Sequence, residues 1–378
     1  MAKNKNLTQA KKAKNDEFYT LISDVEKELK HYKKYFEGKV VYCNCDDPEE
    51  SNFWKFFELN FEEYKLKKLI STHYDAEKPT YKLELFADID GDGKITKGDI
   101  VKTPLKQNGD FRSEESINLL KESDIVVTNP PFSLFEEYIK QLLSSGKKFL
   151  ILGNNNACPQ LIQYFKSKKL RLGYSVNKTM EFEMPDNYKS NIKNSNGKKV
   201  GKVPAISWFT NFEITPNEKL VLIKKYNSTD FPTCDNYNAI YVDKVANIPK
   251  DYNGAMAVPI TILKYMNKNN IITCEADGKT KFYKILGATS FSKECAGELL
   301  IKPEMGTRID LNGKKKYSKI LIQNEDKTNK SVSFKILGAT YSTDKSDDVE
   351  KIRTDPKKRH NPIVGGKEKY TKILIQRT

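Results

Sequence analysis

Two consecutive prolines, Pro130 and Pro131, directly follow a β-branched run that is typical of a buried strand. Residues 125–128 (Ile-Val-Val-Thr) favour a pleated sheet, but proline cannot donate a ladder hydrogen bond, so the strand must end at Asn129. From Phe135 onward, apolar residues recur at helical spacing. The sequence therefore predicts a strand, a rigid Asn-Pro-Pro-Phe turn and a helix, which together are typical of an α/β fold.

The size and composition of the chain restrict its class. With 378 residues it is long enough for two domains, and no apolar run approaches the ~18 residues that a membrane span needs. The first twenty residues lack the apolar core of a signal peptide, and six cysteines occur without a regular framework. We therefore expect a cytoplasmic protein with reduced thiols, no membrane partner and no structural zinc.

Basic residues outnumber acidic residues, and the excess is concentrated near the carboxyl terminus. The whole chain has 65 Lys and Arg against 50 Asp and Glu, a formal charge of +15, and residues 301–378 alone have 19 against 10. A lysine-rich composition overall would raise the charge everywhere. Concentration in one region instead favours a surface that binds a polyanion such as nucleic acid.

Strands and helices are expected to alternate along the first 154 residues. Strand-like stretches lie at 38–45, 66–72, 81–89, 123–128 and 147–154, and helical patterns at 16–35, just after Pro48 and from Phe135. This alternation predicts an open, mostly parallel sheet. Two further β-like stretches, 205–212 and 219–226, are expected to complete that sheet as an antiparallel pair.

The last hundred residues contain a repeat. "KILGAT" occurs at 284–289 and 335–340, and "KYSKILIQ" at 316–323 returns as "KYTKILIQ" at 369–376. The pattern indicates a tandem duplication of one β-rich unit, and two copies are too few for a solenoid. We expect a catalytic domain over residues 1–250 and a β-rich basic lobe over 251–378, with related units at about 281–326 and 334–378.

The turn at Asn129 has the chemistry of a site for a planar amino group. The Asn129 side-chain oxygen and the Pro130 carbonyl are two acceptors that the prolines hold rigid. Accepting both hydrogens of adenine's exocyclic amine would localise its lone pair for attack on a methyl sulfonium, and Phe132 offers a face for a flipped base. This direct transfer needs no metal and no cysteine nucleophile. Cytosine C5 chemistry needs a cysteine, conventionally after a proline, whereas Cys158 precedes Pro159.

The chain resembles the EcoRI-type adenine-specific methyltransferases among the amino-directed DNA methyltransferases. The resemblance implies a Rossmann-like domain that binds S-adenosylmethionine and transfers its methyl group to adenine N6 in duplex DNA. It implies that Asn129, Pro130, Pro131 and Phe132 form the target-base motif and that Phe18, Tyr19 and Thr20 close over the donor's methionine portion. It rests on the segments at residues 14–20, 40–54, 71–75, 105–113, 124–135, 207–211 and 255–263.

The donor-binding side departs from the wider superfamily. A glycine-rich turn usually follows the first strand, but this strand ends in "CNCDDPEESNF" without a glycine. Asn44, Asp46 or Asp47 is a candidate for the donor's ammonium or ribose, and Phe53 packs either on the adenosine or in the core. After the next strand, either Asp75 or His73 is a candidate for the ribose hydroxyls.

Residues 88–99, "DIDGDGKITKGD", carry Asp88, Asp90, Asp92 and Asp99 at the spacing of a calcium-binding loop. Position 12 is Asp where Glu is usual, and a strand-like stretch precedes the loop instead of a helix. We therefore interpret the segment as an acidic hairpin without a metal.

Contacts with DNA are expected in the basic carboxyl-terminal lobe. Two lysine-rich clusters precede the repeated strands: Lys314, Lys315 and Lys316, and Lys357, Lys358 and Arg359. A cognate restriction endonuclease acting on the same site is a candidate partner. Alternatives are an amino-methyltransferase for cytosine N4, RNA or protein glutamine, and a catalytically inactive DNA-binding module. The basic lobe argues against a protein substrate.

Overall fold

The computed structural model describes residues 19–45, 47–183, 199–215, 219–234, 239–266 and 272–288, together with short strands between 310 and 377. The chain divides into two compact units, Met1–Asn324 and Glu325–Thr378. Among the described residues, none of the helices has the length and apolar character needed to cross a bilayer.

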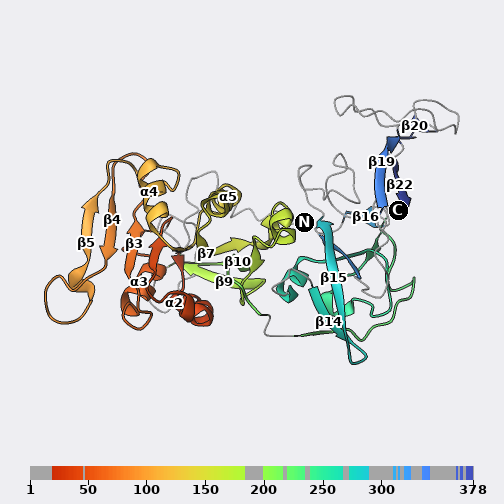
Figure 1. The fold of residues 1–378 in the computed structure, drawn as a ribbon, viewed down its shortest axis with the longest axis horizontal. Coiled ribbons are helices and arrows are strands. Elements are labelled where there is room, and N and C mark those ends of the chain that lie inside the picture. The colour runs from red at the N-terminus through yellow and green to blue at the C-terminus, as the bar shows by residue number, and fades with distance from the viewer. Residues whose placement is uncertain are drawn as a thin grey trace. The chain divides into compact units, whose positions relative to one another are not determined.

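A ten-stranded sheet forms the first part of unit 1 (Figure 1). Its order is β1 (Tyr19–Thr20), β9 (Lys178–Glu183), β10 (Val200–Thr210), β7 (Lys148–Asn154), β6 (Ile125–Thr128), β2 (Val40–Cys43), β3 (Lys68–Thr72), β4 (Tyr81–Leu85) and β5 (Val101–Pro104), with β8 (Arg171–Leu172) paired to β10. The four central strands β7, β6, β2 and β3 run parallel, and the outer strands are antiparallel. The predicted α/β class is confirmed. The expected mostly parallel sheet over the first 154 residues holds for the pairings of β7, β6, β2 and β3, whereas β4 and β5 depart from it as antiparallel strands.

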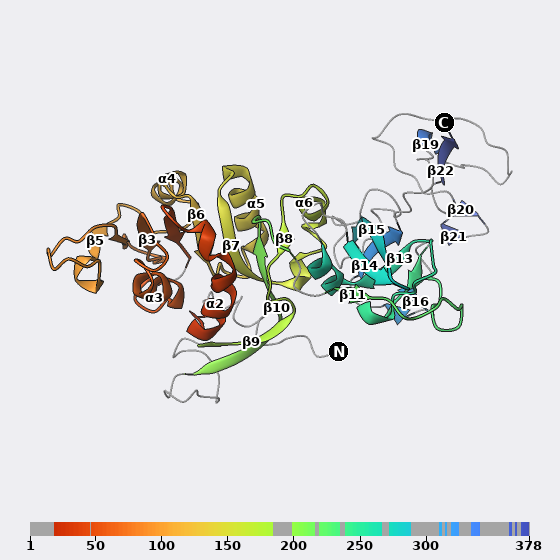
Figure 2. The ribbon, with the colours of Figure 1, turned by 60° about the horizontal axis from the view of Figure 1, so that its bottom comes forward.

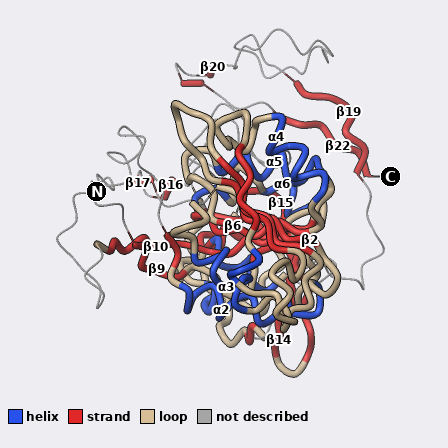
Figure 3. Tube along the Cα trace, turned by 90° about the vertical axis from the view of Figure 1, so that its left-hand side faces the viewer, coloured by secondary structure: helices blue, strands red, loops and turns tan. Residues whose placement is uncertain are grey.

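Helices cover both faces of this sheet. Helices α2 (Ile22–Leu29) and α3 (Asn52–Leu59) lie on one face, and α4 (Glu114–Glu122), α5 (Phe135–Ser145) and α6 (Ile162–Lys166) on the other (Figure 3). The side chains alternate accordingly: Val127 packs in the apolar cluster of α2 and α3, whereas Val126 packs in that of α4 to α6. Burial on both faces explains why the central strands are continuous apolar runs. The helix expected at 16–35 is α2 followed by the 3-10 helix η1 (Lys30–Tyr35).

Unit 1 also contains a six-stranded sheet (Figure 2). Its order is β11 (Leu220–Val221), β14 (Ile272–Ala276), β15 (Lys279–Ala288), β18 (Lys319–Asn324), β13 (Met256–Pro259) and β12 (Ile240–Tyr241). The expectation that residues 219–226 join the first sheet is wrong, because β11 pairs parallel with β14. The reason is that β10 already has neighbours on both sides, so no position beside it remains for an antiparallel partner.

The two copies of the repeated sequence form the same kind of strand pair. In unit 1, β15 pairs with β18 antiparallel, and the register shifts between Ile285 and Gly287. In unit 2, β19 (Phe334–Thr340) pairs with β22 (Lys372–Arg377) antiparallel, and the register shifts between Ile336 and Gly338. Each copy also has a short strand pair, β16 (Asp310–Leu311) with β17 (Lys314–Lys315) and β20 (Ile363–Val364) with β21 (Lys367–Glu368).

Candidate active site

The carboxyl ends of the four parallel strands meet at one edge of the ten-stranded sheet, which is where open α/β sheets bind ligands. Asn129 follows β6, Asn44 follows the neighbouring strand β2, and His73 follows β3. Neighbouring strands lie about 4.8 Å apart. The predicted target-base turn and the predicted donor-binding residues therefore leave the sheet from adjacent positions.

The Asn-Pro-Pro-Phe turn is held between a buried strand and a helix. Strand β6 ends at Thr128, as the double proline predicts, and Asn129 is 5% exposed. The Pro131 carbonyl accepts a hydrogen bond from the Leu134 amide at 3.0 Å, immediately before α5 begins. The half-buried Phe132 ring lies edge-on to Phe182 of β9, with 6.2 Å between the centroids.

Asn44 connects the donor side to the turn through buried hydrogen bonds. The Thr128 hydroxyl donates to the Asn44 carbonyl, and the Tyr138 hydroxyl donates to the Asn44 side-chain oxygen. Burial raises the pKa of Tyr138 well above its ordinary value, so this hydroxyl keeps its proton. Asn44 itself is 2% exposed. The structure thus places this donor candidate in the core, bonded to Thr128 before the Asn-Pro-Pro-Phe turn and to Tyr138 after it.

In the turn after β2, a cysteine adopts the backbone conformation for which a glycine is usual. Cys45 has φ = 76°, in the left-handed region that glycine usually occupies. For a residue with a Cβ this conformation costs roughly 1–2 kcal/mol. The chain therefore turns sharply after β2 through a strained residue, at the place where a glycine was expected. Asp46 lies outside the described residues.

Asp47 and His73 come together from two different strands. The Asp47 Oδ2 atom lies 3.5 Å from His73 Nε2, and the His73 ring stacks on Tyr81 at 4.9 Å between centroids and 2° between planes. Asp75 has other direct partners: its carboxylate accepts a hydrogen bond from the Glu77 amide at 2.9 Å, which lowers the pKa of Asp75, and it lies 3.8 Å from the Lys78 ammonium. Both candidates for the ribose hydroxyls thus lie in the loop after β3, and His73 alone is paired with Asp47 among these described residues.

The described part of the amino-terminal segment lies over the start of α3. Strand β1 pairs with β9, and the Thr20 carbonyl accepts a hydrogen bond from the Asn52 side chain at 2.7 Å. The Thr20 hydroxyl is buried and has no hydrogen-bond partner among the described residues, so a polar ligand group at this point would satisfy it. Phe53 is fully buried, edge-on to Trp208 at 5.8 Å, which is the packing expected of a core aromatic. Phe18 lies outside the described residues.

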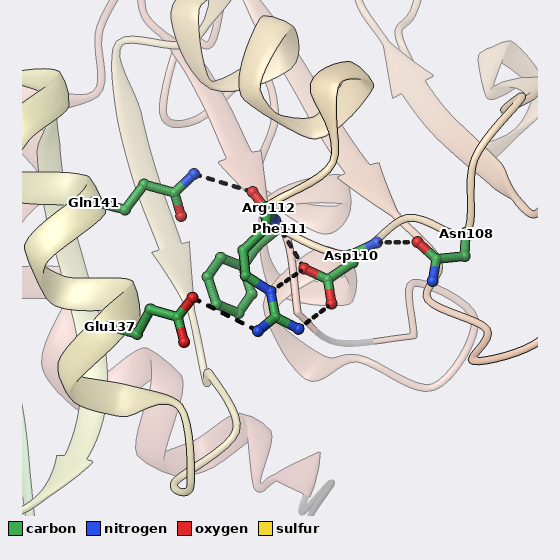
Figure 4. Close-up of polar contacts among 6 residues, drawn as sticks. All are labelled: Asn108, Asp110, Phe111, Arg112, Glu137 and Gln141. Atoms are coloured by element: carbon green, nitrogen blue, oxygen red, sulfur yellow. Dashed lines mark hydrogen bonds and ion pairs between the residues drawn. The ribbon is translucent and has the colours of Figure 1, made fainter.

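Sequence reasoning assigned no role to residues 108–112, which lie beside the donor candidates. Arg112 donates two hydrogen bonds to Asp110, from Nε at 2.8 Å and from a terminal nitrogen at 2.7 Å (Figure 4). Desolvation opposes ionisation of Asp110, but the hydrogen bonds from Arg112 outweigh it and lower the pKa of Asp110. Gly109 has φ = 74°, and a Cβ there would lie 1.9 Å from the His73 carbonyl. In the sequence, the pattern that could have pointed to this segment is Gly109 followed by Asp110 and Arg112.

The acidic loop at residues 88–99 brings three carboxylates together. Ligand oxygens of Asp88, Asp90 and Asp99 lie within 4.8 Å of one another. Backbone amides already bond to them: Asp99 accepts from Ile89, Asp90 and Thr96, which lowers the pKa of Asp99, and Asp88 accepts from Gly91 and Gly93. These bonds suit a closed acidic hairpin, and its independence of metal stays a prediction.

The predicted DNA contacts lie at the limit of what the structure describes. Lys314 and Lys315 form strand β17, of which the backbone alone is described. Lys316, Lys357, Lys358 and Arg359 lie outside the described residues. These contacts stay predictions.

The loops after β6 and β2 offer groups for two neighbouring ligands, and Cys158 is not placed to act as a nucleophile between them. That thiol is fully buried, and burial raises the pKa of Cys158 far above its ordinary value. Asn129 and Pro130 supply carbonyl-type acceptors at the end of β6, and Asp47 supplies a carboxylate after β2. Acceptors suit an amine substrate, and a carboxylate together with the buried Thr20 hydroxyl suits a donor that carries an ammonium and hydroxyl groups.

Comparison with known proteins agrees with this chemistry. The family model described as "Adenine-specific methyltransferase EcoRI" matches residues 6–378. Type II methyltransferase M.EcoRI of Escherichia coli is 43% identical over 287 residues, covering 70% of this chain and 87% of the relative. Type II methyltransferase M.MgeORF184P of Mycoplasma genitalium is 40% identical over 334 residues, covering 84% and 98%. Type II methyltransferase M.MpnI of Mycoplasma pneumoniae is 38% identical over 328 residues, covering 83% and 97%. No solved structure matches the chain significantly.

Proposed function

The chain belongs to the EcoRI family of adenine-specific DNA methyltransferases, and from this membership we propose that it methylates adenine N6 in duplex DNA by direct transfer to a flipped base. The family uses S-adenosylmethionine as methyl donor and DNA as substrate. The observation that carries the finer proposal is the position of Asn129: it is buried directly after β6, next to the strand whose loop carries Asp47.

The turn residues act on the amine of the target base. The Asn129 side-chain oxygen and the Pro130 carbonyl accept the two N–H bonds of the amine, which localises its lone pair, and Phe132 stacks on the base. When bound, S-adenosylmethionine supplies an electrophilic methyl group on its sulfonium. A carbon–nitrogen bond forms as the carbon–sulfur bond breaks, the donor leaves as a neutral thioether, and the amine loses one proton to solvent. Because the two acceptors are fixed before reaction, their contribution falls mainly on the transition state.

The donor side is assigned to the loops after β2 and β3 and to the amino-terminal segment. We assign the donor's ammonium and ribose to Asp46, Asp47 and either His73 or Asp75, with Asn44 supporting the turn from below. Phe18, Tyr19 and Thr20 are assigned to the methionine portion, and the buried Thr20 hydroxyl supports that assignment. Phe53 is assigned to the core that supports these loops, because its ring is fully buried against Trp208.

The carboxyl-terminal region is assigned to DNA recognition. Residues 251–378 carry the repeated sequence, and the equal strand pairing of the two copies supports a tandem duplication. The lysine clusters at 314–316 and 357–359 are assigned to phosphates, which position the protein without reading sequence. A cognate restriction endonuclease for the same site is the proposed cellular partner.

One experiment separates this function from its alternatives. DNA and RNA from cells that express the wild-type chain or Asn129→Ala are digested and analysed by mass spectrometry, and the DNA is mapped by modification-sensitive sequencing. We expect N6-methyladenine at one short sequence with the wild-type chain alone. N4-methylcytosine or methylated RNA would favour the corresponding alternative, and the absence of any new methylation would favour an inactive DNA-binding module.

A further inference from the structure

Helix α5 begins at the catalytic turn and contacts residues 110–112 along one of its faces (Figure 4). The Gln141 amide nitrogen donates a hydrogen bond to the Phe111 carbonyl at 3.0 Å. The Glu137 carboxylate lies 3.6 Å from a guanidinium nitrogen of Arg112. Between these two contacts, Tyr138 packs edge-on against the Phe111 ring at 4.9 Å between centroids. The helix that follows the target-base turn thus holds this segment at three successive points.

The same segment supports the donor side from its other end. The Asn108 carbonyl accepts a hydrogen bond from the Asp75 amide at 3.0 Å, and the Gln107 carbonyl accepts one from the Thr80 amide at 3.3 Å. Gly109 lies so close to the His73 carbonyl that no side chain fits between them. A displacement of residues 108–112 would therefore move the loop after β3, which carries both candidates for the donor ribose.

We propose that Gln141 is a positioning residue, which, with the weaker help of Glu137 and Arg112, fixes the donor-side loop after β3 relative to the catalytic turn. The proposal rests on the proposed function, because it assigns a role in donor binding to residues that do not touch the donor. Helix α5 is the element that both sites share: its amino terminus continues from the target-base motif, and its side chains hold the segment behind His73 and Asp75.

The contacts between helix α5 and residues 110–112 differ in strength. Arg112 and Glu137 are about half exposed, at 48% and 53% of their side chains, so solvent screens their ion pair and it contributes little. The Gln141 bond is partly buried, and the other amide atom of Gln141, Oε1, is buried without a hydrogen-bond partner among the described residues. Replacing Gln141 by methionine, which has a similar length, removes the bond to Phe111 and also removes that unsatisfied acceptor. Removal of that unsatisfied acceptor offsets part of the cost of leaving the Phe111 carbonyl without its donor, so we expect only a small fall in the free energy of unfolding while the segment loses its attachment.

The test compares Gln141→Met with a matched control on the same helix, Lys140→Met, whose side chain is exposed. Titration calorimetry of the full-length protein with S-adenosylmethionine gives both donor affinity and the fraction of active protein, and single-turnover methylation at saturating donor gives the transfer rate. For Gln141→Met we expect a donor Kd raised about 3- to 10-fold and a slower single turnover, with an unchanged KM for DNA. Gln141→Glu should have a larger effect, because its carboxylate would face the Phe111 carbonyl.

The result separates positioning from loss of structure and from failure of the proposed function. A donor Kd and a transfer rate for Gln141→Met that match those of Lys140→Met would overturn the inference. So would a lower active fraction in which the remaining protein binds donor normally, since that is a folding defect. If the wild-type protein binds no donor at all, the proposed function fails and the inference fails with it. The titration of the wild-type protein distinguishes this outcome from a defect of the variant alone.

Discussion

The phenol of Tyr138 donates its hydrogen bond to the side-chain oxygen of Asn44, across the junction between helix α5 and strand β2. The Thr128 hydroxyl donates to the carbonyl of the same asparagine. Thr128 directly precedes the Asn-Pro-Pro-Phe turn, and Tyr138 lies in the helix that follows it. One buried residue directly after β2 therefore contacts both flanks of the Asn-Pro-Pro-Phe turn.

Replacing Tyr138 by phenylalanine tests this junction. The substitution keeps the ring that packs on Phe111 but leaves the Asn44 side-chain oxygen buried without its donor. An unsatisfied buried acceptor costs about 1–3 kcal/mol, so we expect the free energy of unfolding to fall by that amount in urea denaturation. Tyr164→Phe is a suitable control, because Tyr164 is a half-buried tyrosine of the neighbouring helix α6. Equal stability of Tyr138→Phe and the control would show that the bond contributes nothing.

Replacing Asn129 by alanine should remove methyl transfer while leaving donor binding intact. The side chain lies at the end of a strand that keeps its ladder, and alanine deletes one of the two acceptors for the target amine. Loss of one fixed transition-state contact typically lowers turnover about 100-fold or more. Turnover with radiolabelled donor and calorimetric donor affinity are measured together, and Asn118→Ala on the exposed face of α4 is the control. Near-normal turnover of Asn129→Ala would refute the two-acceptor mechanism.

The Phe132 ring should act on the extruded base. It packs edge-on to Phe182 and is half-buried, so it could serve the core or the base. The two roles predict different effects of substitution on the methylation rate. Base–aromatic stacking contributes about 1–3 kcal/mol per base, so Phe132→Ala should impair methylation of duplex DNA strongly, and Phe132→Tyr or Phe132→Trp mildly. Rates on duplex substrates are compared with melting temperatures. A loss of rate that follows the loss of melting temperature across all three variants would indicate core packing.

Local sequence chemistry predicted the parts of the site that depend on neighbouring residues. Two prolines end β6 wherever the strand lies, so the position of Asn129 at a carboxyl end followed from the sequence. The alternation of buried strands with amphipathic helices likewise predicted the parallel centre. The strand at 219–226 was assigned to the wrong sheet. Which strands pair depends on the arrangement of the whole sheet, and a β-like run of eight residues does not indicate which sheet has an open edge.

The remaining features of the site are long-range or depend on the backbone. The bond between Gln141 and Phe111 joins residues 30 positions apart, and neither residue type indicates the other. The left-handed Cys45 could not be predicted, since a cysteine with positive φ is held by its surroundings against its own preference. The pairing of Asp47 with His73 likewise appears only when β2 and β3 lie side by side.

Calcium should be dispensable. The carboxylates of Asp88 and Asp99 are bonded to backbone amides that close the hairpin, so the loop needs no ion to hold its shape. Treatment with a chelator, or addition of millimolar calcium, should change neither the melting temperature nor the methylation rate. An Asp90→Asn variant serves as the reference for any electrostatic effect of the loop. A calcium-dependent rise in melting temperature that disappears in this variant would instead establish a structural ion site.

The second copy of the repeat should be removable without loss of donor binding. Among the described strands, β19 pairs with β22 and β20 with β21, so deletion of residues 327–378 takes no strand from either sheet of unit 1. We expect the truncated protein to bind S-adenosylmethionine as the full chain does. Its DNA affinity should depend less steeply on salt, because each lost phosphate contact reduces the slope by about 0.9.

Site specificity is the measurement that separates a reader from a stabilising cap. Phosphate contacts position the protein, whereas sequence must be read at base edges, for which Gln323, Asn324 and Asn361 are candidates. Methylation across a random-sequence library should therefore become less specific after the deletion. A full-length variant with Lys357, Lys358 and Arg359 replaced by alanine is the matched control: it should lose salt slope and keep specificity, because it removes charge without removing the fold of the copy. If the truncated protein methylates the same site with the same salt dependence, the second copy does not contact DNA, and its role is confined to packing.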